Sequence, residues 1–180
     1  PWYKHHHNVE EYFARIGAAL QHGEEQRSIL VIHPIESFWG IASQRGEQDH
    51  GDVWKMHDIR TLLLKANLDF DYGEEEMMSR HASVEGNLLR MAKASYKTVV
   101  IPELRTIRKT TLDLLQKFAQ AGGNVFCYGA VPEYLDGEKS DLPKQVFASF
   151  KPVTYETLTE NVSAVDRLIS ITDDADGKEV

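Results

Sequence analysis

Acidic and aromatic side chains follow three short apolar runs of the sequence, and side chains of these types could bind or cleave a sugar. They are His33, Glu36 and Trp39 in VIHPIESFWG, Asp71 and Tyr72 in LDFDYG, and Glu103 in TVVIPEL. Carboxylates accept hydrogen bonds from sugar hydroxyls, and an aromatic face covers the apolar side of the ring. We expect these six residues to contact a carbohydrate.

Two other interpretations of the acidic residues stay open. Hydrolysis of a glycosidic bond requires two carboxyl groups at a defined separation, and Glu36, Asp69, Asp71, Glu74 and Glu103 all follow or end apolar runs. The same residues could instead cap helices and pack against neighbouring domains. Because the chain has 28 Asp and Glu residues, carboxylates in loops are expected by chance, and we assign no catalytic residue.

The single cysteine is a second candidate for chemistry. Cys127 stands two residues before Gly129 in NVFCYGAVPE, which is half of the G-x-C-x-G pattern of cysteine hydrolases and amidotransferases, with Val125 in place of the first glycine. A thiol nucleophile needs a base, normally histidine. Class I amidotransferases take that histidine from after the cysteine, and all eight histidines here lie at or before His81. We therefore interpret Cys127 as a buried residue of a strand.

The sequence offers no metal-ligand set, phosphate loop or basic surface. His33, His50, His57 and His81 include no pair at the i, i+4 spacing of a zinc-binding helix. The net charge is −8, and the Lys and Arg residues form no cluster that would bind nucleic acid. No apolar run approaches the roughly 20 residues of a membrane span. We expect a soluble chain with no cofactor, no metal, and neither nucleic acid nor membrane as a partner; the compartment is open, with the cytoplasm favoured.

Patterns typical of helices and of buried strands alternate along the chain. Apolar residues recur at helical intervals in residues 9–20, 53–66 and 106–121, and continuous apolar runs appear in SILVIHP, TVVIPE and NVFCYG, with a strand end in DFDYG. This alternation predicts an α/β fold, a flavodoxin-like doubly wound parallel sheet with helices on both faces. Because the carboxyl ends of parallel strands meet at one edge, the candidate residues should lie along that edge.

The connections and the last elements are less regular. A long connection is expected from Pro34 to His50, and Glu85-Gly86-Asn87 indicates the turn of a small hairpin. Short helices are expected in LPKQVFASF and ENVSAVDRLIS. The residues AGG should cap the preceding helix.

The two ends of the sequence indicate a segment of a longer polypeptide. The tail ISITDDADGKEV reads as a strand, an Asp/Gly turn and the start of a second strand. We divide the chain into an N-terminal linker and helix (1–23), an α/β domain (24–170) and the start of a following β-rich domain (171–180).

The motifs at the strand ends resemble the α/β domain that follows the catalytic barrel in bacterial glycoside hydrolases of the α-L-rhamnosidase type. The likeness spans roughly residues 1–172 and includes EEYFARIGAALQHG, SILVIHPIESFW and LDFDYGEEEMM. Its most diagnostic part is Y-K-x-V-V-x-P-x, followed by a helix and GG-x-V. The sequence is similar, more distantly, to the trimerisation domain of family 42 β-galactosidases, which has a class I glutamine amidotransferase-like fold without that chemistry.

The resemblance implies a non-catalytic accessory domain that supports or walls the carbohydrate site of an adjacent barrel. The family's catalytic carboxylates lie in the barrel, so none is carried over to this chain. The expected partners are adjacent domains of the same polypeptide and a carbohydrate, with a homo-oligomer as a further candidate. The alternatives are a free-standing cysteine hydrolase or amidotransferase-like enzyme and a pure oligomerisation module.

Overall fold

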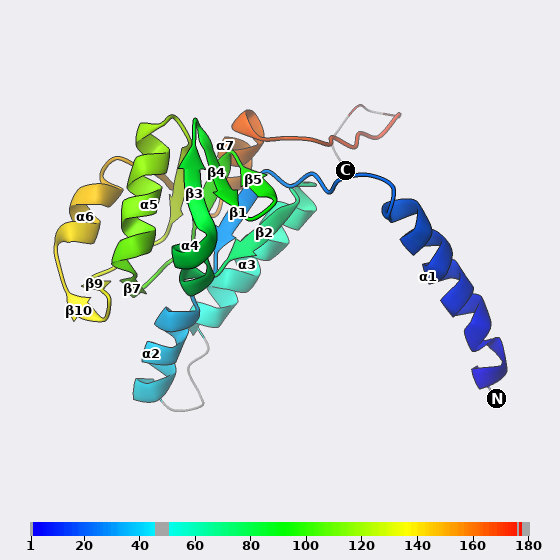
Figure 1. Ribbon diagram of the computed structural model, residues 1–180, viewed down its shortest axis with the longest axis horizontal. Helices are drawn as coiled ribbons and strands as arrows, with labels where there is room; N and C mark the ends of the chain where they lie inside the picture. The colour runs from blue at the N-terminus through cyan, green and yellow to red at the C-terminus, as the bar shows by residue number, and fades with distance from the viewer. Residues whose placement is uncertain (1, 46–50, 176, 178–180) are drawn as a thin grey trace.

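The chain folds around a central sheet flanked by helices (Figure 1). The computed structural model describes residues 2–45, 51–175 and 177, with the backbone alone for 41–45 and 51–57. In chain order the elements are η1 (Trp2–His5), α1 (His6–Leu20), β1 (Ile29–Ile32), α2 (Ile35–Arg45), α3 (Gly51–Lys65), β2 (Phe70–Gly73), α4 (Glu75–His81), β3 (Ala82–Glu85), β4 (Leu88–Met91), β5 (Ala94–Tyr96), β6 (Thr98–Ile101), β7 (Thr106–Ile107), α5 (Lys109–Gln120), β8 (Asn124–Tyr128), β9 (Tyr134–Leu135), β10 (Glu138–Lys139), α6 (Leu142–Phe147), β11 (Lys151–Val153) and α7 (Leu158–Val165).

The central sheet has five strands in the order β11-β8-β6-β1-β2, and every neighbouring pair is parallel. Numbered along the chain within this sheet, the order is 5-4-3-1-2, which is the flavodoxin-like arrangement. The predicted fold class is therefore confirmed. The chain reverses its direction of winding between β1 and β6, which are neighbours in the sheet.

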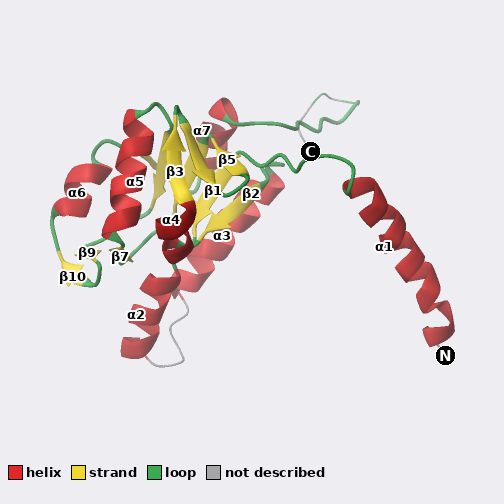
Figure 2. Ribbon diagram, in the orientation of Figure 1, coloured by secondary structure: helices red, strands yellow, loops and turns green. Residues whose placement is uncertain are grey.

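Alternating side chains of the strands build a separate apolar core on each face of the sheet. Leu30 and Ile32 of β1 pack with residues of α4, α5, α6 and the strands β3 to β5. Ile29 and Val31 point the other way and pack with residues of α3 and α7. Helices thus cover both faces (Figure 2), which explains why β1 and β6 consist entirely of buried residues.

Two small sheets accompany the central one. The predicted turn at Glu85-Gly86-Asn87 is confirmed, and β5 extends the hairpin to an antiparallel β3-β4-β5 meander. Gly86 has a positive φ of 59°, a conformation that glycine adopts without strain. In the other sheet, β9 pairs parallel with β7 and antiparallel with β10.

Several predicted boundaries are wrong. Residues 35–45 form α2 rather than part of a long connection, because no proline interrupts IESFWGIASQR; residues 46–50 lie outside the described residues. Strand β11 was not predicted, since Pro152 argues against a strand, but β11 is an edge strand that pairs only with β8, where proline is tolerated. The third helix starts at Lys109, after the short strand β7, rather than at Thr106.

Helix α1 extends away from the rest of the fold (Figure 1) and contains no buried residue. It begins at His6, with His5 at the N-cap. After α7, the described residues of the tail form no helix and only an isolated bridge at Thr172. The division of the chain into a linker, an α/β domain and a following β-rich domain stays a prediction. No helix among the described residues is long and apolar enough to cross a membrane.

Candidate functional site

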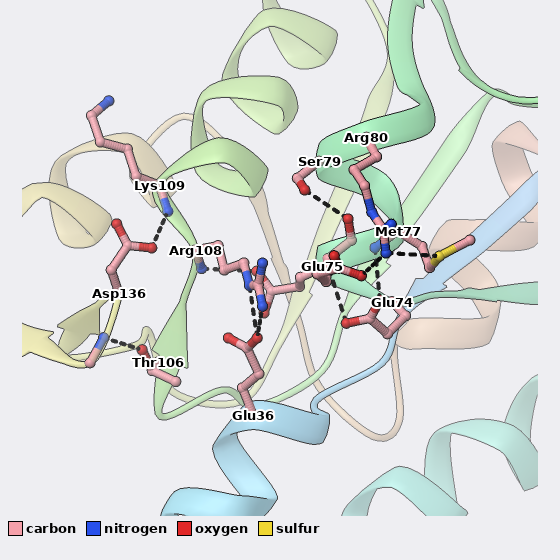
Figure 3. Close-up of polar contacts among 12 residues, drawn as sticks. Glu36, Glu74, Glu75, Met77, Ser79, Arg80, Thr106, Arg108, Lys109 and Asp136 are labelled. Carbon is pink, nitrogen blue, oxygen red and sulfur yellow. Dashed lines mark hydrogen bonds and ion pairs between the residues drawn. The ribbon is translucent and has the colours of Figure 1, made fainter.

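Four charged side chains meet at the edge of the sheet where the strands end, and we call them the rim cluster: Glu36, Glu74, Glu75 and Arg108 (Figure 3). Glu36 lies in the first turn of α2, which follows β1. Glu74 and Glu75 begin α4 directly after β2. Arg108 is the N-cap residue of α5, which follows β6 and β7. Since the strands are parallel, all four residues reach the same edge of the sheet.

The Arg108 guanidinium forms an ion pair with Glu36. Its Nε donates to Glu36 Oε1 at 2.7 Å, and its Nη2 contacts the same oxygen. Both side chains are partly buried, with 31% of Arg108 and 23% of Glu36 exposed. This double contact holds the start of α2 against the start of α5.

Glu74 and Glu75 are adjacent in sequence but have opposite electrostatic environments. Glu74 caps α4: its carboxylate accepts hydrogen bonds from Glu76 N at 2.9 Å and Met77 N at 2.8 Å. Burial raises the pKa of Glu74, but these hydrogen bonds outweigh burial and the pKa is lowered. Glu75 is only 2% exposed. Burial raises the pKa of Glu75 to about 7, the negative charge of Glu36 adds to the rise, and the N–H of Arg108, which donates to Glu75 Oε2 at 2.9 Å, opposes it.

The loop after β6 is bound to α2 by a buried serine. Ser37 is 3% exposed. Its Oγ accepts from Arg105 N at 3.0 Å and Thr106 N at 3.2 Å, and donates to Thr106 O at 3.2 Å. Doubly wound folds bind ligands in the crevice between the two strands at which the winding reverses. Here these hydrogen bonds join the segments that would border such a crevice, beyond β1 and β6.

The rim cluster therefore contains the residue types of an acid–base site, but its carboxylates are buried or already bound. A pKa near neutrality suits a general acid, but Glu75 is inaccessible to a substrate. The Glu36 carboxylate is bound by Arg108, and the Glu74 carboxylate by the backbone of its own helix. The contacts fix the relative positions of α2, α4 and α5, which is a structural role.

The predicted sugar-contacting residues lie in different parts of the fold. His33 and Tyr72 are neighbours, with ring centroids 5.6 Å apart in an edge-to-face arrangement, and Tyr72 is 43% exposed. Burial raises the pKa of the Tyr72 hydroxyl. Trp39 on α2 is 66% exposed. Glu103, after β6, packs against Gly129, which follows β8; a Cβ at Gly129 would come within 2.7 Å of the Glu103 Cβ.

Asp71 lies away from these residues, toward the opposite edge of the sheet. Its Oδ1 accepts from Arg27 Nη1 at 2.6 Å, and its Oδ2 accepts from the Tyr96 hydroxyl at 2.9 Å. Arg27 precedes β1 and Tyr96 precedes β6, so both partners stand at the amino ends of strands. Asp69 is also bound there, by Arg27 Nε at 3.3 Å. The structure thus brings together only some of the carboxylates that the sequence placed along one edge.

Cys127 has the environment of a core residue. It is a member of β8, its side chain packs against the apolar core on the α5 face, and burial raises its pKa to about 12. A thiolate nucleophile requires the opposite shift. Within the described part of the chain, no histidine side chain forms a hydrogen bond with the Cys127 thiol.

No group of three or more potential His, Cys, Asp or Glu metal ligands occurs among the described residues. Of the four histidines considered as ligands, His50 and the side chain of His57 lie outside the described part of the chain. Sequence reasoning missed Ser37, Glu75 and Arg108. The available signal was the basic residue directly before an amphipathic helix, in RTIRKTTLDLL.

No protein-family model and no curated protein matches the sequence. Among solved structures, the fold is similar to the crystal structure of apo exo-carrageenase GH42 from Bacteroides ovatus, with a TM-score of 0.48 and 16% sequence identity. The match covers 78% of this chain and 17% of that chain.

Proposed function

We propose that this chain is a non-catalytic α/β domain of a multidomain glycoside hydrolase of the α-L-rhamnosidase type. In this proposal the domain supports or walls the carbohydrate site of an adjacent catalytic barrel. The sequence motifs at the strand ends support the family. The structural role of the rim cluster and the position of Cys127 within the core support the absence of independent catalysis.

The observation that carries the accessory role is the exposed apolar face of α1. Its side chains share one side of the helix and are between 37% and 78% exposed: Val9, Tyr12, Phe13, Ile16 and Leu20. An amphipathic helix gains most of its stability from packing that face against another surface. No surface of the described α/β fold buries it. We therefore assign this face to a neighbouring domain of the same polypeptide.

The role as a wall of a sugar site is supported by the exposed aromatic residues near the carboxyl ends of β1 and β2. Trp39 and Tyr72 present ring surface to solvent, and His33 packs against Tyr72. Aromatic faces of this kind bind the apolar side of a sugar ring. Asp71 is excluded from this wall, because its carboxylate is occupied by Arg27 and Tyr96 on the other edge.

The isolated chain should not hydrolyse aryl glycosides, p-nitrophenyl α-L-rhamnoside included, in a release assay with the folded state checked by circular dichroism. The physical reason is that the buried Glu75 and the ion-paired Glu36 cannot reach a glycosidic oxygen. Turnover that disappears in Glu36→Gln but persists in Glu85→Gln, an exposed control, would contradict the proposal.

The double substitution Tyr12→Ser with Phe13→Ser should change the free energy of unfolding of the isolated chain by less than about 0.5 kcal/mol, because both rings are already exposed. In a polypeptide that carries the neighbouring domains, the same substitution should lower the melting temperature or the glycosidase activity. Calorimetry and activity assays measure the two effects. No effect in that longer polypeptide would argue against an interdomain role of α1.

The same exposed face also favours one alternative, an oligomerisation module. Light scattering on the wild-type chain and on the double variant distinguishes an oligomerisation module from an interdomain surface. A concentration-dependent oligomer that becomes monomeric in the variant would favour self-association, whereas a monomer in both cases fits an interdomain surface.

A further inference from the structure

Two carboxyl groups of the rim cluster compete for one guanidinium. The side chain of Arg108 forms an ion pair with Glu36, while its backbone N–H donates to Glu75 Oε2 at 2.9 Å. The charge of each carboxylate acts on Arg108, and the charge of Arg108 acts on Glu75 in return. Arg108 thus starts at the carboxyl group of Glu75 and ends at that of Glu36 (Figure 3).

A buried hydroxyl beside Glu75 is not used in the arrangement that the structure shows. Thr111 lies three residues after Arg108 in α5, and its Oγ1 is buried without a hydrogen bond of normal geometry. The hydroxyl nevertheless lies close enough to Glu75 to favour the ionised form of the carboxyl group. A buried polar atom normally has a partner. This donor therefore suits a second state of the cluster, in which Glu75 is charged and accepts from Thr111.

We propose that Arg108 exchanges partners with pH, binding Glu36 while Glu75 is neutral and Glu75 once it ionises. The physical reason is the difference in burial. Glu75 is 2% exposed, whereas 23% of the Glu36 side chain is exposed and can be hydrated. A buried charge gains more from a counterion than a hydrated charge does. The exchange offsets only part of the cost of burying the charge, because Arg108 gives up Glu36.

The other charged side chains on the helices around Glu75 have partners of their own. Glu74 accepts hydrogen bonds from the backbone of α4. Arg80 and Lys109 form ion pairs at i, i+4 spacing within α4 and α5. Of these cations, Arg108 is the one whose charge acts on Glu75. Arg108 is therefore the cation that responds when Glu75 loses its proton.

The exchange should loosen the start of α2. In the structure, the Arg108–Glu36 pair holds the first turn of α2 against the start of α5. The hydrogen bonds between Ser37 and the loop after β6 would remain, so α2 should become less protected without detaching. Because burial raises the pKa of Glu75 to about 7, the change should occur near neutral pH. This inference does not depend on the proposed function.

Hydrogen exchange of the 180-residue chain, followed by NMR, tests the exchange of partners. The reporter is the Phe38 amide of α2, which donates to Pro34 O at 3.0 Å. Its protection factor, which corrects for the intrinsic pH dependence of exchange, should fall about 10-fold between pH 6 and pH 8. In Glu75→Gln it should stay constant, because glutamine does not ionise. In Glu36→Gln it should already be low at pH 6 and should not fall further.

Carbon-13 NMR of the Glu75 carboxyl group provides a second measurement, which needs no variant. The midpoint of its titration should coincide with the fall in protection. Thr111→Val, which removes the hydroxyl but keeps the shape of the side chain, should move both midpoints to higher pH, so the test holds even if Glu75→Gln fails to fold.

Three results would overturn the proposal. If the Glu75 carboxyl group titrates while the protection of α2 stays constant, Arg108 remains with Glu36. If protection falls equally in Glu75→Gln, another group is responsible, such as His33, which lies two residues before α2. If the Glu75 carboxyl group keeps one protonation state from pH 5 to pH 8, no exchange takes place.

Discussion

Gly123→Ala should destabilise the chain by about 3 kcal/mol. A Cβ at this position would lie 2.2 to 2.4 Å from three atoms of the Phe118 ring, far inside van der Waals contact. Phe118 is fully buried in the core on the α5 face, so its ring cannot move aside without displacing other core residues. Urea unfolding followed by circular dichroism would measure the loss of stability.

The contact is part of the end of α5. Gly122 N donates to Ala119 O at 3.1 Å and Gly123 N donates to Phe118 O at 2.9 Å, which are the two hydrogen bonds of a Schellman motif. Gly122 takes the left-handed conformation, with φ 92°. Gly123 does not, so alanine at position 123 is opposed by the Phe118 ring rather than by backbone strain. The chain then enters β8 directly, which leaves the backbone little freedom to relax.

A double-mutant cycle distinguishes the clash with Phe118 from the general effect of replacing a glycine by alanine. Phe118→Leu removes the ring, so Gly123→Ala should cost about 2 kcal/mol less in the Phe118→Leu background than in the wild type. Gly17→Ala is the matched control, because nothing lies within 4 Å of a Cβ at that position in α1. Additive effects of the two substitutions would contradict the prediction.

The central sheet was predictable because its strands are continuous apolar runs. The runs ILVI and TVVI are buried on both faces, and only a parallel sheet covered by helices on both sides buries such runs completely. The AGG cap was predictable for a similar reason, since the sequence contains the glycine that the left-handed residue requires. Helix α2 and strand β11 were missed because Gly40 and Pro152 argue locally against elements that tertiary contacts stabilise.

The candidate site was harder to predict, because pairing in space decides which carboxylates are accessible. Glu36 is bound by Arg108, 72 residues away, and Asp71 by Arg27, 44 residues away. Asp71 and Tyr72 are successive residues of β2, so their side chains point to opposite faces of the sheet. Sequence spacing identifies the residues that follow a strand, but it does not identify which of them already have a partner.

Glu75→Gln should make the chain more stable than the wild type at pH 8, by about 2 to 3 kcal/mol. The pKa of Glu75 is raised from an ordinary value near 4.5 to about 7 in the folded state. Between these two pH values the folded chain binds more protons than the unfolded chain, so stability falls as pH rises through this window, by on the order of 3 kcal/mol in total. Glutamine keeps an oxygen that can accept from Arg108 N but never ionises.

The difference in free energy of unfolding between Glu75→Gln and the wild type should therefore be near zero at pH 5 and should grow up to pH 8, as measured by urea unfolding at each pH. Glu74→Gln is the matched control on the same helix. Because the pKa of Glu74 is lowered in the folded state, its carboxylate stabilises the fold above pH 5, and its loss should cost about 1 kcal/mol at pH 8. Two adjacent glutamates should thus give effects of opposite sign. If Glu75→Gln is instead less stable than the wild type at pH 8, the carboxylate is ionised in the folded state and Arg108 compensates its burial.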